Sequence, residues 1–167
     1  KIGIQKIIKS IGSENGNFEM IISTEVKDRA GEVVKQNGID TSFYKSNPVV
    51  LWAHNYSSMP IGITDKIIKK NKQTIAKGRF APSEEGQQIR KLYEAGFIKT
   101  ASIGFIPLEM EDNVIMKSEL LEWSFVPVPA NAGALSLLTA KEFDVANLVT
   151  KGIIVKEEEK KDKKKDE

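Results

Sequence analysis

Seven short segments with strand-like composition constrain the fold of this chain more than any other feature. Each is rich in β-branched or aromatic residues and is bounded by turn residues. The segments are residues 18–26, 32–35, 48–54, 61–70, 74–80, 100–106 and 120–128. They do not alternate with helices, which predicts an antiparallel sheet, and closure into a barrel would leave no exposed strand edges. The predicted fold class is therefore mainly β with flanking helices, a closed antiparallel β-barrel of about seven strands.

Two connections between these segments have the composition of hairpin turns. They are residues 28–31 and residues 71–73. In the first, Gly31 is free to adopt a positive φ. We therefore expect a tight turn at each position.

Two amphipathic helices are expected to pack on the sheet. Ser83 can cap the first helix, which has acidic residues in its first turn and ends at Gly96. The second begins with a capping box formed by Thr139 and Glu142. Both helices carry an apolar stripe that indicates burial against the barrel.

The chain is expected to form one domain followed by a charged tail. Its 167 residues, 40% of them apolar, suit a single core. We place this domain at residues 1–150 and the tail at residues 151–167. Residues 156–167 are all charged, with both signs equally represented, so they lack the apolar side chains needed for a core.

Composition excludes several kinds of chemistry. The chain has no Cys and one His, which removes disulfides, thiol catalysis and the usual zinc and iron–sulfur sites. The 25 basic and 23 acidic residues are too evenly balanced for phosphate-backbone binding. No apolar run has the length of a membrane span, and no signal peptide is evident. These observations predict a soluble, cytoplasmic protein without metal or cofactor.

The single histidine, His54, lies where a buried strand is expected to end in a loop. It follows the apolar run PVVLWA at residues 48–53 and precedes the polar residues NYSS. A catalytic base can occupy such a position, and so can a structural or surface histidine. The pattern alone leaves both interpretations open.

Two strands are predicted to carry small polar faces. Alternation in residues 100–105 places Ser102 and Gly104 on one face, where the glycine would admit another backbone or form a bulge. In residues 120–126, Glu122 and Ser124 share a face opposite the aromatic residues. A carboxylate at this position should face water, or else hold an imidazole or a basic side chain.

Four motifs, taken in order, resemble those of the caudovirus prohead serine proteases. They are DRAGEV at residues 28–33, NPVVLWAH at 47–54, ASIGF at 101–105 and EWSFVPVPAN at 122–131. The resemblance extends from about residue 18 to residue 138. This family is similar in fold to the herpesvirus capsid proteases called assemblins, which are β-barrels surrounded by helices.

The resemblance implies a catalytic triad. It makes His54 the general base, Ser102 the nucleophile and Glu122 the third member. Assemblins use a second histidine as the third member, and this chain has none, so a carboxylate must replace it. Glu122 would then orient His54 and stabilise the imidazolium that forms when Ser102 attacks a peptide carbonyl.

Three features of this site remain open in the sequence. Ser124 shares the face of Glu122 and is a second candidate nucleophile, ranked behind Ser102. Asp65 or Glu119 could replace Glu122 as the acid. Backbone N–H groups of residues 131–134 are the expected oxyanion donors, because the paired arginines that assemblins use after this strand are absent.

The resemblance implies a serine endopeptidase that cleaves scaffold and capsid-protein segments, and itself, inside an assembling phage procapsid in the host cytoplasm. It also implies a homodimer or an assembly-dependent oligomer, without nucleic acid or membrane as partner. The alternative is an inactive protease-like module that serves capsid assembly. A barrel that binds single-stranded nucleic acid fits poorly, because Trp52 and Trp123 lie in apolar patterns without interleaved Lys.

Overall fold

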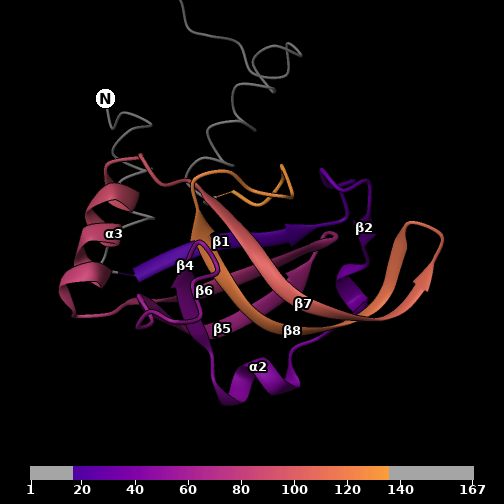
Figure 1. The fold of residues 1–167 in the computed structure, drawn as a ribbon, viewed down its shortest axis with the longest axis horizontal. Coiled ribbons are helices and arrows are strands. Elements are labelled where there is room, and N and C mark those ends of the chain that lie inside the picture. The colour runs from indigo at the N-terminus through magenta and orange to yellow at the C-terminus, as the bar shows by residue number, and fades with distance from the viewer. Residues whose placement is uncertain (1–16, 136–167) are drawn as a thin grey trace, which may run out of the picture.

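A computed structural model describes residues 17–135, and its sheet has eight strands (Figure 1). The strands are β1 (Asn17–Thr24), β2 (Val33–Val34), β3 (Ile39–Asp40), β4 (Val49–Trp52), β5 (Gly62–Lys70), β6 (Gln73–Phe80), β7 (Thr100–Glu111) and β8 (Val114–Val126). The helical segments are η1 (Gln36–Gly38), α2 (Ser42–Ser46) and α3 (Glu84–Glu94). The predicted fold class, mainly β with few helices and a nearly closed barrel, is confirmed.

The order β1-β6-β5-β4-β8 forms most of the barrel wall, and β7 pairs with β8. Residues 134–135 nearly close the gap between β7 and β1. The N–H of Ile21 donates to the carbonyl of Leu135 at 2.9 Å, and the N–H of Ala101 donates to the carbonyl of Ala134 at 3.1 Å. The segment after β8 therefore lies between the two end strands and satisfies backbone groups of both.

The sheet is not wholly antiparallel, which differs from the prediction. β8 is 13 residues long, and β2, β3 and β4 pair with it in parallel along one edge while β7 pairs antiparallel along the other. Residues 28–31 form a hydrogen-bonded turn with Gly31 at φ +85°, but β1 and β2 do not pair with each other. Residues 71–73 do form the expected hairpin, because Asn71 and Lys72 both have positive φ between β5 and β6.

Aromatic side chains fill the barrel next to the carboxyl ends of β4 and β8. Phe18 contacts Phe80, Trp123 and Phe125 edge-to-face, with ring centroids 5.1 to 5.5 Å apart. All four are buried. Such pairs contribute about 0.5–1.5 kcal/mol each beyond area burial, so they fix the strand from which Glu122 and Ser124 project.

The first predicted helix is confirmed as α3, at one side of the barrel (Figure 1). Ser83 caps it by accepting a hydrogen bond from the N–H of Gly86 at 3.2 Å, and Gly96 follows it with φ +81°. Tyr93 is buried against the barrel, whereas the neighbouring Leu92 is 43% exposed. The second predicted helix and the charged tail lie outside the described residues, and no described helix has the length and hydropathy of a membrane span.

Candidate active site

A tight turn at the end of β4 presents His54. Ala53 and His54 both have positive φ, 49° and 56°, and the N–H of Asn55 donates to the carbonyl of Trp52 at 3.0 Å. These values are typical of a type I′ turn, which glycine or asparagine usually forms. Left-handed backbone costs a residue with a Cβ roughly 1–2 kcal/mol, so neighbouring contacts must hold the turn. One of them joins Ala53 N–H to the Phe125 carbonyl at 2.9 Å.

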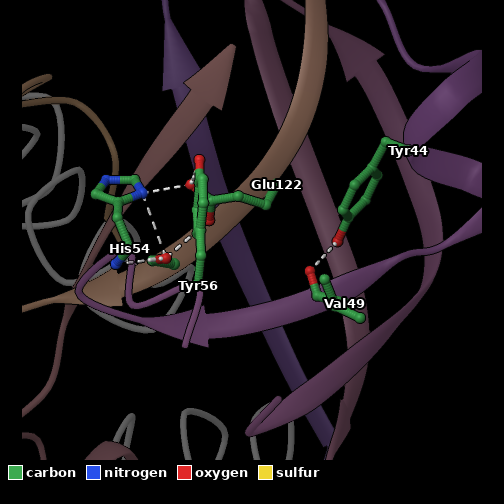
Figure 2. A network of polar contacts seen from close by, with 6 residues as sticks. Tyr44, Val49, His54, Tyr56 and Glu122 are labelled. Carbon is green, nitrogen blue, oxygen red and sulfur yellow. Dashed lines mark hydrogen bonds and ion pairs between the residues drawn. The ribbon is translucent and has the colours of Figure 1, made fainter. Parts of the chain in front are cut away.

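The carboxylate of Glu122 is the centre of the polar contacts at this turn (Figure 2). Glu122 is 3% exposed, and its Oε1 contacts Nδ1 of His54. Ser124 Oγ donates to Oε2 at 2.8 Å, and the Tyr56 hydroxyl donates to Oε1 at 3.4 Å. The sequence predicted that Glu122 would face water or hold an imidazole or a basic side chain. In the structure it contacts the imidazole of His54.

Burial and the charge of this carboxylate together raise the pKa of two nearby tyrosines. Burial raises the pKa of the Tyr56 hydroxyl, and the charge of Glu122 and the hydrogen bond to it raise that pKa further. Burial likewise raises the pKa of Tyr44, with a smaller contribution from Glu122. Both hydroxyls therefore remain protonated at neutral pH, and Tyr56 keeps its proton for donation to Glu122.

Ser124 contacts both the backbone of the histidine turn and the carboxylate of Glu122. It is completely buried, and its Oγ accepts the backbone N–H of His54 at 3.0 Å while donating to Glu122. The same oxygen lies 3.4 Å from Nδ1 of His54. Ser124 thus ties the backbone of the histidine turn to the carboxylate that contacts the histidine ring.

Gly104 makes room for the carboxylate. It lies opposite Glu122 in the β7/β8 pairing, and a Cβ at this position would lie 2.2 Å from Glu122 Oε1 and 2.9 Å from the Tyr56 hydroxyl. Both distances are shorter than the contacts of real Cβ atoms, so a side chain at this position would force Glu122 and Tyr56 to move. The sequence left open whether this glycine admits another backbone or forms a bulge. The β7/β8 register shifts between Gly104 and Phe105, as a bulge would produce, and the space beside Gly104 holds the side chains of Glu122 and Tyr56.

Ser102 lies opposite Ser124 in the same pairing. Directly opposed residues of an antiparallel pair share a face, so Ser102, Ser124 and Glu122 are on one side of the sheet. Ser102 is partly exposed while Ser124 is buried. In the described part of the chain, no hydrogen bond joins Ser102 to His54.

The alternative acids lie elsewhere. Asp65 is exposed and forms an ion pair with Arg79 at 2.9 Å. Glu119 pairs by register with Ile106 and Asp40, farther along β8 from the level of Ser102. Glu122 is the carboxylate that the structure brings to His54.

The turn after β8 is held by Asn131. Its Nδ2 donates to the carbonyl of Thr24 at 2.8 Å, and its Oδ1 accepts the Gly133 N–H at 2.9 Å. The Ala134 N–H donates to the carbonyl of Asn131 at 3.1 Å, so Gly133 and Ala134 are engaged within the turn. Among residues 17–135, nothing accepts from the N–H groups of Asn131 and Ala132. Leu135 pairs with Thr100, which brings this turn beside the start of β7.

Some of these contacts had no signal in the sequence. Tyr56 belongs to no sequence motif, and its hydroxyl reaches Glu122 only because the turn at residues 52–55 reverses the chain.

No group of three or more acidic or histidine side chains in the described ranges is arranged to hold a metal ion.

An imidazole held by a buried carboxylate, with a serine on the neighbouring strand, is the residue set of hydrolases that use a serine nucleophile. The sequence model of one protein family, described as caudovirus prohead serine protease, matches residues 16–147. The match spans most of the chain, which therefore belongs to the caudovirus prohead serine protease family. Comparisons with curated proteins and with solved structures found no significant match.

Proposed function

We propose that this chain is a serine endopeptidase that cleaves scaffold and capsid-protein segments, and itself, inside an assembling phage procapsid. The observation that carries the proposal is the contact between His54 and the buried Glu122, on the sheet face that also bears Ser102. Family membership supplies the phage capsid context. The proposal also includes association of this chain into a homodimer or an assembly-dependent oligomer.

In the proposed mechanism His54 is the general base. Donation of its Nδ1–H to Glu122 fixes the tautomer in which Nε2 is unprotonated, and Nε2 lies on the ring edge away from Glu122 (Figure 2). Ser102 Oγ attacks the peptide carbonyl as Nε2 takes its proton, and the imidazolium then protonates the leaving amine. Glu122 stabilises the imidazolium. Water hydrolyses the acyl-enzyme by the reverse proton transfers.

Two further assignments complete the mechanism. Ser102 is the nucleophile because it is accessible, whereas the hydroxyl of Ser124 is buried and already donates to Glu122. The N–H groups of Asn131 and Ala132 are the proposed oxyanion donors, since no residue in 17–135 accepts a hydrogen bond from them and their turn lies beside the start of β7.

The edge of β7 supports a peptide as substrate. The N–H of Ala101 points away from β8, so by alternation the backbone groups of Ile103 and Phe105 point the same way. Beyond Leu135, no described strand pairs with this edge. An extended peptide can add there as a strand, and Pro107 limits the pairing because it has no N–H to donate.

The test is labelling with a fluorophosphonate serine probe, followed by mass spectrometry of the modified residue. We expect modification of Ser102, no labelling of Ser102→Ala, and a fall of about 10⁴ in cleavage of co-expressed capsid and scaffold proteins by that variant. Ser124→Ala is the matched control and should still be labelled at Ser102. Retained cleavage in Ser102→Ala would overturn the proposal, and absence of labelling in any assembly state would favour the inactive assembly module.

A further inference from the structure

A pocket of about 510 Å³ lies between α3 and the segment that follows β4. Its apolar lining comes from Trp52, Met59, Ile61 and Ile89. Its polar lining comes from Asn55, Ser57, Ser58, Glu85 and Gln88. Pockets that bind small ligands or side chains have this size and this mixture of apolar walls with a few polar groups.

The pocket adjoins the proposed general base. Asn55 directly follows His54 in sequence, and Trp52 is the residue at which the histidine turn begins. The next residue, Tyr56, contacts Glu122. The same loop therefore lines the pocket and carries His54 and Tyr56, the residues that contact Glu122.

The charge of the pocket lining determines which substrate side chains it would favour. Glu85 is the one charged residue in its described lining, and it makes no ion pair with any other described residue. The α3 dipole adds about half a positive charge at this helix end, which is less than the full negative charge of Glu85. The net field therefore favours a cation, and a long aliphatic stem fits the apolar walls.

We propose that this pocket is a specificity subsite that binds a lysine or arginine side chain of the substrate segment, with Glu85 as its charge partner. This inference rests on the proposed endopeptidase function and names the substrate class of that site. The stem would pack on Met59 and Ile89, while the cationic head would reach the carboxylate and the amides at the rim.

The first experiment is cleavage of a randomised peptide pool by the full chain, with products sequenced by mass spectrometry. We expect lysine and arginine to be enriched at one position relative to the cleaved bond. Matched peptides with lysine or norleucine at that position should then differ in kcat/KM, and Glu85→Gln should reduce the ratio about fivefold. Glu84→Gln, on the adjacent residue outside the pocket lining, should leave the ratio unchanged.

The outcomes separate the two proposals. Cleavage that survives Ser102→Ala contradicts the proposed function. Cleavage that depends on Ser102, but shows no basic preference or a preference unaffected by Glu85→Gln, contradicts only the subsite. Enrichment of an aromatic residue at the same position would mean that the apolar walls alone determine specificity, which also overturns the role of Glu85.

A binding measurement keeps the inference testable apart from catalysis. Acetylated alanine pentapeptides with a central lysine, norleucine or glutamate are titrated into Ser102→Ala protein and followed by NMR. The lysine peptide should shift the signals of the Trp52 indole and the Ile89 methyl groups most, and Glu85→Lys in the same background should remove the difference. Equal shifts from all three peptides, or shifts only at other residues, would overturn the subsite.

Discussion

Two buried polar networks in the barrel differ in how they deal with charge and water. The Gln36 network, formed by Gln36, Ser23 and Thr74, contains no charged group. Gln36 Nε2 donates to Ser23 Oγ at 3.0 Å and to the carbonyl of Val34 at 2.8 Å, while Thr74 Oγ1 donates to Gln36 Oε1 at 2.7 Å. All three side chains are nearly inaccessible, so the network is closed and fully satisfied.

The active-site network, formed by His54, Tyr56, Glu122 and Ser124, is closed on one side only. Its carboxylate and Ser124 are buried, but the His54 side chain is 36% exposed. Burying a carboxylate is costly, and its hydrogen bonds offset that cost only in part. The Gln36 network therefore contributes stability, whereas the active-site network keeps a carboxylate in contact with a solvent-accessible imidazole at some cost in stability.

The largest expected effect is that of Glu122→Gln on catalysis. The amide cannot select the Nδ1–H tautomer or stabilise the imidazolium, so kcat should fall by about 10⁴, or roughly 5 kcal/mol of transition-state stabilisation. Cleavage kinetics on a capsid-protein segment measure the loss, and circular dichroism shows whether the fold persists.

Asp65→Asn is the control for Glu122→Gln, because that carboxylate is exposed and paired with Arg79. It should leave kcat unchanged. A Glu122→Gln variant with normal kcat would remove the distinction between the two networks, since the charge would then have no catalytic role.

An intermediate effect is expected for Gln36→Leu, this time on stability. Leucine leaves Ser23 and Thr74 without their buried partner, which should lower the free energy of unfolding by about 2–4 kcal/mol. Urea denaturation measures the change, and kcat per folded molecule should not move. Gln73→Leu, at a partly buried glutamine with no side-chain hydrogen bond in the described part, should cost far less. Equal losses would show that the network contributes nothing specific.

The fold was predictable where local patterns decide it. Alternation located the strands, and Ser83 and Gly96 bounded α3 because caps act within one turn. The outer halves of β7 and β8 were missed although residues 106–111 alternate apolar with other side chains. Pro107 argues against a strand there, and these residues are exposed on both faces. The parallel pairing of β4 with β8 depends on residues about 70 positions apart, so no local pattern contains it.

The sequence proposed residues for the candidate site but not the contacts among them. The single histidine and the four motifs pointed to His54, Ser102 and Glu122. That Gly104 makes room for Glu122 follows from cross-strand register, which shifts at irregularities along the β7/β8 pairing. Register and side-chain packing are tertiary properties, so the supporting residues emerged only with the fold.

The smallest of the three effects should be that of Ser124→Ala. This change removes the donor to Glu122 Oε2 and the acceptor for the His54 N–H, but leaves the contact between the histidine ring and the carboxylate. Looser positioning should reduce kcat about tenfold, or about 1.4 kcal/mol, with KM unchanged. Fluorophosphonate labelling of Ser102 should slow by a similar factor.

Ser118→Ala provides the matched control, at another buried serine of the same strand. Ser118 is 1% exposed, and its hydroxyl has no hydrogen-bond partner within the described residues. Removing this hydroxyl should leave kcat unchanged. It should not lower the free energy of unfolding, because the hydroxyl makes no hydrogen bond with the described residues that the change could remove. If both serine variants lost activity equally, the loss would be caused by altered packing of β8. If Ser124→Ala alone lost it, a buried hydroxyl on β8 would act in catalysis only where it joins the histidine turn to the carboxylate.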